Sequence, residues 1–558
     1  MKTDTLDFKY CFFLILLCLA FYLPGIKAMP PVDRDEARFA QATRQMVESG
    51  DYVRINFQDQ ARNKKPIGIY WLQAASVVLS GTAGSREIWP HRVPSLLGAM
   101  AAVLFTFGIG RRLFDRKTAF LGAAFCAGSL LLTIEAHLAK TDAVMLATIA
   151  ASQLGLSRYY VRPDPDTPVG PGAFWLFWGG QALGILIKGP IPPMVSLLTI
   201  LGLFAADRNL KWLKGIRPLR GLLLVAAVAS PWLIAIGVAT KGAFYQGALG
   251  KDLFSKVASG QESHGFPPGY YLLLVWATFW PASSFLVPGL WRAWKLRSSP
   301  AVRFCLAWIV PVWLVFELVP TKLPHYVLPT WPALALLAAA AVVSASAQPG
   351  AEPREKLVRL GFIPYSLVVL CLGFGLSAIP YLLEGRITPL TLVPAAASVL
   401  AAAVMTGQSL KSRFISAAGV AVAGSWLVLA PAFQFVVPGT DALWLSRSVA
   451  SAVHRIGHQG GSDPPVASAG YHEPSLVFLL GTRTVLTSPS GVAQILKENP
   501  RALALVSGRE EQAFRRETVR LGLEVAVLES IEGVNYSHGK KTALKLYGVM
   551  PGQSVGLR

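Results

Sequence analysis

Long apolar stretches alternate with short polar connections along most of the chain. The core of a bilayer is about 30 Å thick, and a helix crosses it with roughly 20 predominantly apolar residues. On this measure the hydrophobic pattern predicts thirteen transmembrane helices. They are expected near residues 8–24, 91–110, 118–134, 143–160, 173–187, 190–206, 221–238, 269–290, 304–319, 327–347, 361–383, 390–407 and 414–436.

The polar connections differ in charge in a way that predicts orientation. One alternating set is rich in lysine and arginine, and such loops stay in the cytoplasm. It comprises residues 111–117, 158–162, 207–220, 291–297, 353–359 and 411–413. The N-terminus is therefore expected in the cytoplasm. Thirteen crossings then place the C-terminal region outside, in the periplasm of a bacterium, and the protein in the inner membrane.

Two segments of the first outer loop have the pattern of helices that lie on the membrane surface. Residues 36–50 place Ala37, Ala40 and Val47 on one face and polar side chains on the other. Residues 66–79 are more apolar but too short to span, and they are flanked by charge. Together they predict a platform of two juxtamembrane helices over the helix bundle.

The composition changes near residue 437 to that of a soluble domain. From Asp441 onward, helical and strand-like segments alternate, which predicts a small α/β layer structure. This segment carries no Gly-rich phosphate loop and no nucleophile motif, so we expect a lid or scaffold rather than a second catalytic unit. The predicted domains are residues 1–436, with the first outer loop at 25–90, and residues 437–558.

Composition supports an integral membrane protein and weighs against nucleic acid as a partner. Hydrophobic residues make up 53% of the chain and charged residues 15%, whereas soluble domains carry about 25% charged residues. The net charge of +21 lies mostly in the short connections, where topology explains it. All five cysteines fall inside apolar stretches without metal-type spacing, which is typical of small buried side chains.

Acidic residues gather where the first helix ends. Asp33, Asp35 and Glu36 follow it directly, and Asp142 heads the fourth predicted span. Acids in a first helical turn also act as caps, and that alternative remains open. However, one acid suffices for a cap, and an ionisable group at the end of an apolar helix indicates function. Asp35, Asp142 and Glu36 are therefore the candidate catalytic residues.

Cations and tyrosines are predicted on the same side as these acids. Lysines held beside proline or glycine are suitable point-charge partners for phosphate, although each alone could simply reach toward lipid headgroups. Their number on the acid-bearing side favours a joint phosphate-binding function. The candidates for binding a phosphate-bearing donor are Lys65, Lys188, Lys322, Arg38, Arg92, Tyr326 and Tyr70.

A metal site is a further candidate. Glu262 and His264 occur in one outer loop and could supply two ligands, with the third from elsewhere in the fold. No established metal spacing is present. If a divalent metal binds, its expected role is structural, and no cofactor is predicted to be required.

Several short motifs resemble those of a known family. They are DEARFA (35–40), KKPIGIYW (64–71) and TKLPHY (321–326), together with the acid heading the fourth span and the KG turn. They are similar to the GT-C glycosyltransferases of the protein O-mannosyltransferase-like family, in particular the bacterial branch that transfers 4-amino-4-deoxy-L-arabinose to lipid A. The sequence departs from that pattern at Lys64, where an acid is expected, and at His325, where a small polar residue is usual.

The resemblance implies a fold and an activity. The fold is a polytopic α-helical GT-C bundle of about thirteen transmembrane helices, with juxtamembrane helices and a small C-terminal α/β domain. The activity is transfer of a sugar from undecaprenyl phosphate to a lipid A phosphate on the periplasmic face, giving resistance to cationic peptides such as polymyxin. Asp35, Lys65, Asp142, Lys322 and Tyr326 match the family's motif positions. A monomer is expected.

Other function classes remain open. Within the enzymes, a protein O-mannosyltransferase-like reaction is the alternative. A lipid-linked sugar transporter would place its charges at the bilayer midplane, whereas here they crowd the outer rim. A non-enzymatic envelope scaffold would use the C-terminal domain for binding, so deletion of residues 441–558 should separate it from an enzyme.

Overall fold

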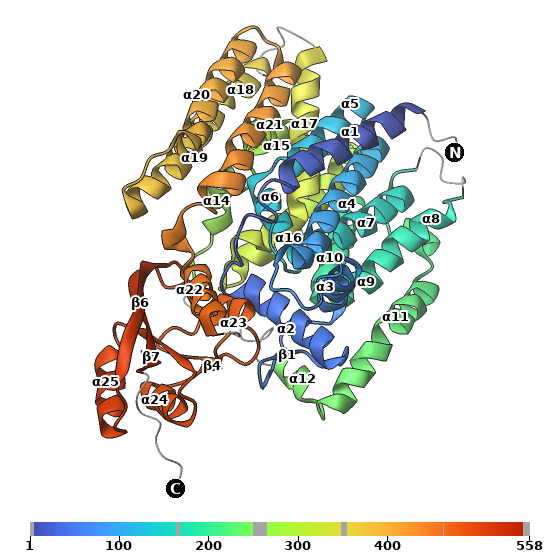
Figure 1. Ribbon diagram of the computed structural model, residues 1–558. Helices are drawn as coiled ribbons and strands as arrows, with labels where there is room; N and C mark the ends of the chain where they lie inside the picture. Colours follow the sequence, from blue (N-terminus) through green and yellow to red (C-terminus); the bar gives the residue numbers. More distant parts are fainter. Residues whose placement is uncertain (1–4, 163–167, 249–264, 348–353, 461–462, 551–558) are drawn as a thin grey trace.

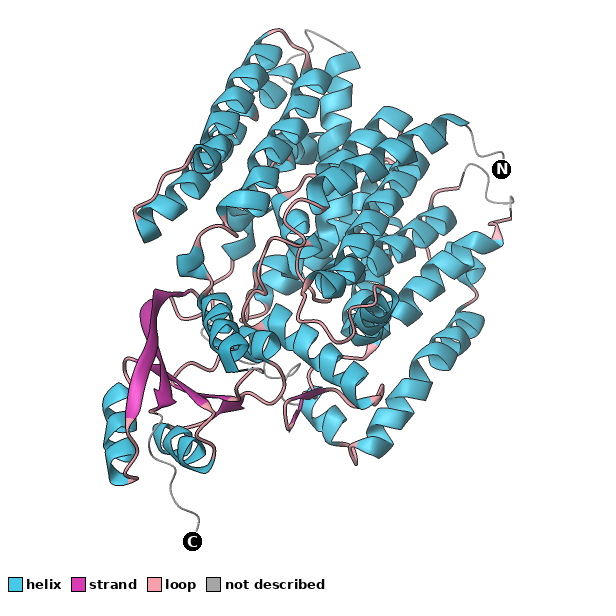
Figure 2. Cartoon of the chain, in the orientation of Figure 1, coloured by secondary structure: helices cyan, strands magenta, loops and turns pink. Residues whose placement is uncertain are grey.

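A helical bundle and a smaller mixed layer structure make up the protein (Figure 1). The computed structural model describes residues 5–162, 168–248, 265–347, 354–460 and 463–550. Figure 2 shows that helices account for the bundle, whereas the main sheet is confined to the C-terminal region. The bundle corresponds to the apolar part of the sequence.

The first half of the chain is almost wholly helical, apart from a two-stranded antiparallel ribbon in the first loop. Its elements are α1 (Thr5–Tyr22), α2 (Asp35–Ser49), β1 (Asn56–Phe57), β2 (Gln60–Ala61), α3 (Gly68–Leu79), α4 (Trp89–Leu113), α5 (Arg116–Ala127), α6 (Leu130–Ala136), α7 (Asp142–Tyr160), α8 (Pro171–Phe174), α9 (Gly180–Lys188), α10 (Ile191–Asp207), α11 (Pro218–Ala239) and α12 (Ala243–Tyr245). A π-helical turn, η1 (Trp175–Gly179), joins α8 to α9.

The second half completes the bundle before the chain enters the layer structure. Its helices are α14 (Tyr270–Thr278), α15 (Leu286–Lys295), α16 (Pro300–Leu318), α17 (Trp331–Ala347), α18 (Arg354–Leu360), α19 (Phe362–Glu384), α20 (Pro389–Leu410) and α21 (Phe414–Pro431). A 3₁₀ segment, η5 (Pro324–Thr330), leads directly into α17. Each of the thirteen predicted spans therefore coincides with one or more helices.

The number of membrane crossings stays a prediction. Among the described residues, seven helices are long and apolar enough to cross, or up to nine if each of two bent pairs forms one span. One bent pair is α5 with α6, at 60°. The other is α14 with the segment Ala282–Lys295, at 116°. The span predicted near 269–290 therefore consists of two helical segments with a sharp bend between Thr278 and Ala282, and whether the pair crosses the membrane once stays a prediction.

The predicted turn between the fifth and sixth spans is confirmed. α9 ends at Lys188 and α10 begins at Ile191. Gly189 adopts φ +63°, a backbone conformation that glycine reaches without the steric cost of a side chain. The ammonium group of Lys188 is thereby fixed at the end of the bundle.

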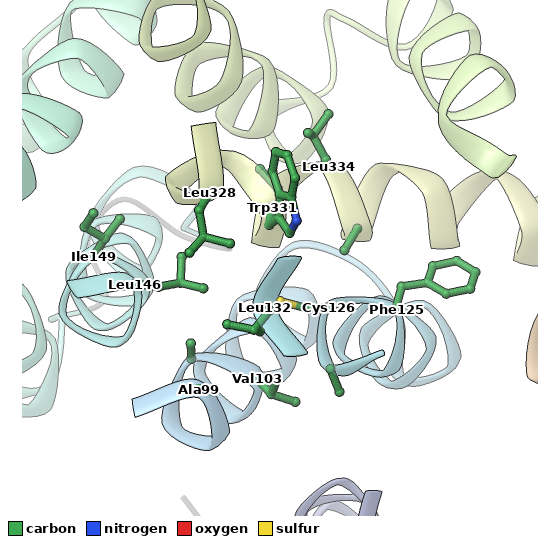
Figure 3. Packing of buried hydrophobic residues seen from close by; sticks show 14 of the residues in the cluster. Ala99, Val103, Phe125, Cys126, Leu132, Leu146, Ile149, Leu328, Trp331 and Leu334 are labelled. Carbon is green, nitrogen blue, oxygen red and sulfur yellow. The ribbon is translucent and has the colours of Figure 1, made fainter. Parts of the chain in front are cut away.

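Small side chains allow the central helices to approach closely. A Cβ atom added to Gly98 of α4 would lie 2.8 Å from the backbone of Val144 in α7. Figure 3 shows Leu132, Leu146 and Leu328 gathered with other apolar side chains between these helices and η5. Such packing fixes the bundle ends that carry the polar residues described below.

α2 and α3 lie at one end of the bundle, as the amphipathic patterns predicted (Figure 1). Thr43 of α2 donates to the Gln73 side chain of α3 at 2.7 Å, and both are buried. Ser76 of α3 donates to the carbonyl oxygen of Pro90 in α4 at 2.6 Å. The two platform helices are therefore joined to each other by a buried hydrogen bond, and α3 is joined to the bundle by a partly buried one.

The C-terminal region forms a five-stranded mixed sheet with helices on both faces. The strand order is β4-β3-β5-β7-β6, with β3 parallel to β4 and β5, and β7 antiparallel to β5 and β6. The elements are α22 (Leu445–Gly460), β3 (Val466–Ala469), α23 (Pro474–Leu480), β4 (Val485–Leu486), α24 (Pro489–Glu498), β5 (Leu503–Ser507), α25 (Glu511–Arg520), β6 (Val525–Asn535) and β7 (Lys540–Val549). The predicted α/β alternation is confirmed.

Alternation along β5 builds the two faces of this sheet. Leu503 and Leu505 pack with α22 and α23, whereas Ala504 and Val506 pack with α24 and α25. Successive side chains of a strand point to opposite faces, so one strand serves two apolar cores. These cores contain no residue of the bundle.

The layer structure contacts the first loop directly. The backbone N–H of Asp33 donates to the Tyr536 hydroxyl at 2.8 Å, and the Asp33 carboxylate accepts from the N–H of Ser475 at 3.0 Å. Arg34 donates to the carbonyl oxygen of Ser537 at 2.5 Å. The turn between β6 and β7 thus holds the residues that immediately precede Asp35.

Candidate active site

A polar cavity of about 370 Å³ opens beside the first turn of α2. Segments distant in the chain supply its walls: the loop before α2, the loop before α3, the starts of α7 and η5, and the end of α9. Its charged and hydroxyl-bearing lining residues are Asp33, Arg34, Asp35, Glu36, Arg38, Arg62, Lys64, Lys65, Lys140, Thr141, Asp142, Lys188, Thr321, His325 and Tyr326. Seven of the predicted site residues therefore share one cavity, namely Asp35, Glu36, Arg38, Lys65, Asp142, Lys188 and Tyr326.

The two adjacent acids of α2 have opposite environments. The Asp35 side chain is 57% exposed and faces the cavity, whereas the Glu36 side chain is 1% exposed. Consecutive helix positions differ by about 100° in direction, so one acid faces the cavity and the next faces the bundle. Only Asp35 is free to meet a ligand.

Glu36 is paired with Arg92 in a fully buried ion pair. Arg92 Nε and Nη2 donate to the two Glu36 carboxylate oxygens, each at 2.8 Å. The remaining Arg92 donors bind the carbonyl oxygens of Ile26, Met29 and Pro30 at 2.7–2.9 Å. The structure therefore does not bring Arg92 into the cavity with the other predicted phosphate-binding residues, because its guanidinium holds the first loop.

The Glu36 carboxylate has structural partners as well. It also accepts from the backbone N–H groups of Val32 and Ala139, each at 2.8 Å. A carboxylate with four hydrogen bonds has no capacity left for proton transfer. Glu36 is thus a buried anchor that ties α2 to the start of α7, rather than a catalytic group.

Asp142 lies within a cluster of cations at the cavity floor. Its carboxylate contacts Lys188 Nζ directly, with Lys140 Nζ at 3.9 Å and His325 Nε2 at 3.6 Å. Glu135 accepts from Lys140 at 2.9 Å. Burial would lower the pKa of Lys140, but Glu135 and Asp142 outweigh it and hold that pKa above its ordinary value. The ammonium group is therefore charged.

Asp35 is kept ionised by the cations around it. Arg62 lies 4.0 Å from its carboxylate. The protein atoms around the cavity partly desolvate the carboxylate and would raise the pKa of Asp35, but the charges of Lys140 and Arg62 outweigh this effect and lower it. Arg62 itself stacks over Phe39, 4.9 Å from the ring centroid, and donates to the Tyr70 hydroxyl at 3.2 Å. Tyr70, which was predicted to bind the phosphate-bearing donor, is fully buried and outside the cavity lining, where it positions Arg62.

Lys322 does not reach the cavity either. Its ammonium group donates to the carbonyl oxygens of Glu317 and Val319 at 2.7 and 2.8 Å. These are orphan acceptors at the end of α16, and a lysine that binds them caps the helix. The structure therefore does not place Lys322 with the other predicted phosphate-binding residues. Its neighbours Thr321 and Leu323 form the wall instead.

The predicted metal ligands Glu262 and His264 lie outside the described residues. Within the part of the chain that the structure describes, no group of three His, Cys, Asp or Glu side chains is arranged to hold a metal ion. His325 is the one histidine among the described residues that lines the cavity, and it packs between acids and lysines.

Several charged residues of the cavity lining were not among the site residues predicted from the sequence, including Arg62, Lys140 and His325. The charge density of the segments 62–65 and 135–142 was visible. The partner of each cation could not be read from the sequence, because the partners are supplied by other segments of the chain. Arg62 and Lys140 are both within the field of Asp35, and they belong to the site as fully as the predicted lysines.

Comparison of the whole fold identifies its class. The crystal structure of ArnT from Cupriavidus metallidurans bound to undecaprenyl phosphate superposes with a TM-score of 0.75 at 18% identity, covering 96% of this chain and 97% of that one. The fold is therefore the predicted GT-C fold, with interfacial helices and a small C-terminal sheet domain.

Sequence comparison gives the more particular likeness. Residues 64–234 match the family described as dolichyl-phosphate-mannose-protein mannosyltransferase. Undecaprenyl phosphate-alpha-4-amino-4-deoxy-L-arabinose arabinosyl transferases of Aeromonas salmonicida and Aeromonas hydrophila are each 28% identical, over 329 and 330 residues. Each match spans 59% of this chain and 59% of the relative's length. The predicted resemblance to ArnT-like GT-C proteins is confirmed.

Proposed function

We propose that this protein is an integral-membrane glycosyltransferase. It moves 4-amino-4-deoxy-L-arabinose from undecaprenyl phosphate to a phosphate group of lipid A. The observation that carries the proposal is the single cavity in which an exposed, ionised Asp35 faces several cations at one end of a GT-C bundle. The names of the similar Aeromonas proteins and of the Cupriavidus structure support the choice of sugar and carrier.

The cations of the cavity are suited to a departing phosphate. Breaking the bond between the sugar and the polyprenyl phosphate leaves a second negative charge on the phosphate. Lys65, Arg38 and Arg62 line the cavity around Asp35, and fixed cations near a developing charge lower the barrier. Lys188 is held by Asp142, so it offers a charge at a defined position.

Asp35 then acts on the sugar rather than on the acceptor. A lipid A phosphate is already an anion and attacks the anomeric carbon without losing a proton to a general base. An ionised Asp35 can pair with the ammonium group of the amino sugar and orient the anomeric carbon. Asp142 supports this arrangement indirectly, because it fixes Lys188 and Lys140.

The location follows from the charge distribution along the sequence. We place the N-terminus in the cytoplasm, with the cavity and residues 437–558 in the periplasm of a bacterial inner membrane, since the basic loops then stay inside. Residues 1–436 form the catalytic membrane domain and residues 437–558 a separate domain, consistent with their distinct apolar cores. Modification of lipid A there would give resistance to cationic peptides such as polymyxin.

A protein O-mannosyltransferase-like reaction is the second candidate, supported by the family match over residues 64–234. Its acceptor would be a serine or threonine hydroxyl, which needs a general base. Asp35 would then accept that proton. The two reactions differ in product and in the role of the same carboxylate.

The test is a reconstituted transfer reaction. Purified protein is incubated with labelled undecaprenyl-phosphate sugars and either lipid A or a peptide acceptor, and the products are identified by mass spectrometry. Lipid A carrying one added aminoarabinose is the expected product. A glycosylated peptide would favour the second candidate. Movement of the donor across a vesicle membrane with no covalent product would indicate a transporter.

A further inference from the structure

A second cavity adjoins the first on the side of the C-terminal sheet. Its volume is about 570 Å³. Apart from one glycine, every residue of its lining is polar: Arg34, Arg38, Gly470, His472, Glu473, Asn535 and His538. The apolar surface that a polyprenyl chain requires is missing from this lining, so the cavity suits a polar headgroup.

The two cavities share a wall. Arg34 and Arg38 line both of them, and they stand one turn apart at the start of α2, where the N–H of Arg38 donates to the carbonyl oxygen of Arg34 at 3.2 Å. A molecule reacting in the first cavity therefore lies within reach of the second. A headgroup larger than one sugar could occupy both at once.

The shared wall is held in an unusual conformation. Arg34 has φ +66°, a region that is costly for a residue with a side chain. Its guanidinium donates to the carbonyl oxygen of Ser537 at 2.5 Å, and the preceding N–H donates to Tyr536. Strained backbone of this kind persists where surrounding contacts enforce it, and it occurs frequently at ligand sites.

Hydrogen-bond donors outnumber acceptors in the second cavity. Among the described residues, the Arg38 guanidinium makes no hydrogen bond or ion pair. The Glu473 carboxylate, in contrast, accepts from Asn535 at 2.9 Å and lies 3.6 Å from His538. His538 is 65% exposed, and an imidazole donates a hydrogen bond in either protonation state. The balance favours an anion.

We propose that this second cavity anchors a phosphate group of the acceptor glycolipid, other than the phosphate that attacks the sugar. Arg38 and His538 donate to it. His472 Nε2 lies 3.2 Å from the carbonyl oxygen of Ser468, so this ring donates to the phosphate through Nδ1 in its imidazolium form. The shared wall sets the distance between the anchored and the reacting phosphates. The proposal rests on the proposed function, since it assumes a phosphorylated glycolipid acceptor. It makes His472 and His538 positioning residues for the acceptor.

The acceptor is favoured over the donor for a structural reason. The phosphate of the sugar donor, undecaprenyl phosphate, requires the lysines of the first cavity, and its polyprenyl chain requires an apolar path. The second cavity lies between α2 and the turn after β6, on the side of the sheet rather than of the bundle. A headgroup entering from the membrane surface can reach it, whereas a polyprenyl tail there would lie in water.

The experiment compares transfer by the wild type and by H472Q/H538Q, with R516Q as control. Arg516 is an exposed cation on α25 of the same domain, outside both cavities. We expect the double variant to raise the KM for lipid A about 5–10-fold while kcat and the donor KM stay within twofold. R516Q should match the wild type. If the double variant melts at a lower temperature than the wild type, H538Q alone provides the test, since the His538 side chain is largely exposed.

A second acceptor and a binding assay make the outcome decisive. With lipid A lacking one phosphate, wild type and H472Q/H538Q should have the same raised KM. Binding to nanodiscs containing lipid A, measured without donor, should weaken in the variant, whereas binding to phosphatidylglycerol nanodiscs should not. Equal acceptor KM and equal lipid A binding in wild type and variant would overturn the second site. Failure of the wild type to transfer any sugar would contradict the proposed function, and the binding assay would still decide the second site.

Discussion

Neighbouring residues at the start of α2 have separate roles although both are acids. Asp35 faces a polar cavity and several cations, whereas Glu36 is buried in the bundle with Arg92. The cost of burying a charge explains the difference: Glu36 is tolerated only because every lone pair has a donor. Asp35 keeps the freedom that a substrate-binding group needs. Substitution of Asp35 should therefore affect activity, whereas substitution of Glu36 or of its partner Arg92 should affect stability.

Asp35→Asn and Lys65→Ala should each lower transfer at least about 100-fold, because each removes a charge that faces the substrate. The melting temperature in detergent should stay within about 2 °C of the wild type, since neither residue is part of the buried core. Transfer to lipid A by purified protein measures the first effect. Asp59→Asn, an exposed acid in the same loop, is the control and should be fully active. Wild-type activity of either cavity variant would remove that residue from the site.

Arg92→Met should have the opposite profile. Leaving Glu36 buried without its partner costs about 3–5 kcal/mol. The melting temperature, or the denaturant concentration at the unfolding midpoint, should therefore fall strongly. Glu36→Gln should act in the same direction. A variant that unfolds like the wild type but loses activity would show instead that Arg92 meets the substrate.

Helix packing decides where these residues stand. α4 and α7 approach so closely at Gly98 that no side chain fits, and small residues at such contacts let helices pack tightly in a bilayer. The start of α7 carries Asp142, so this contact fixes the height of the acid relative to α2. The first loop depends equally on the turn after β6, through Tyr536 and Ser537.

Gly98→Ala should lower the free energy of unfolding by about 1–3 kcal/mol, because overpacking forces the backbones apart. Gly375→Ala in α19 is the matched control. A Cβ atom there meets nothing within 4 Å, and the change should be neutral or slightly stabilising. Thermal unfolding of the two variants in one detergent measures the difference. Equal stability would mean that α4 and α7 separate without cost.

Tyr536→Phe tests the contact between the sheet and the first loop. The Asp33 N–H loses its acceptor, which costs about 1 kcal/mol and should loosen the segment that orients Asp35. We expect kcat to fall several-fold with the domain still folded. Tyr547→Phe removes a hydroxyl that donates to Glu511 in the same domain and should leave kcat unchanged. Identical kinetics for the two variants would indicate that the turn does not position Asp35.

For the molecule as a whole, the C-terminal layer structure is part of the site rather than a distant lid. Its turn after β6 holds Asp33 and Arg34, and its residues line the second cavity. Deletion of residues 441–558 should therefore abolish transfer even in an enzyme. The deletion does not separate an enzyme from a scaffold as the sequence suggested, because the acids remain but their backbone loses its support.

The junction between the two parts should respond to pH. Burial raises the pKa of Asp33 to about 6, with the hydrogen bond from Ser475 opposing this effect, whereas an unfolded aspartate has a pKa of about 3.9. The folded junction thus favours the protonated form. Its contribution to stability is full below about pH 4 and is lost as pH rises through about 6, a change of about 1–2 kcal/mol after allowing for partial exposure.

Hydrogen exchange of the segments around Ser475 and Tyr536 measures this change. Protection should fall between pH 4 and pH 6 in the wild type, after correction for the intrinsic exchange rate. Asp33→Asn should remove most of that dependence, because an amide does not titrate in this range. An unchanged pH profile in the variant would show that Asp33 does not cause the effect.

Periodic and compositional features were determined by the sequence alone. The apolar helices, the two surface helices, the turn at Gly189 and the strand–helix alternation after Asp441 follow from local patterns, because each element's preference is encoded in consecutive residues. The presence of acids and lysines at one end of the bundle followed from the loops that carry them.

Only the tertiary structure decided which charges meet a ligand and which meet each other. From the sequence we predicted Glu36, Arg92, Tyr70 and Lys322 as site residues. In the structure, each of them forms hydrogen bonds with a partner inside the protein. The sequence also did not predict the sharp bend between Thr278 and Ala282 or the contacts of Asp33 and Arg34 with the C-terminal sheet domain. The physical reason is common to all of these: a charged side chain takes the nearest partner that compensates its burial, and that partner usually belongs to a segment far away in the chain.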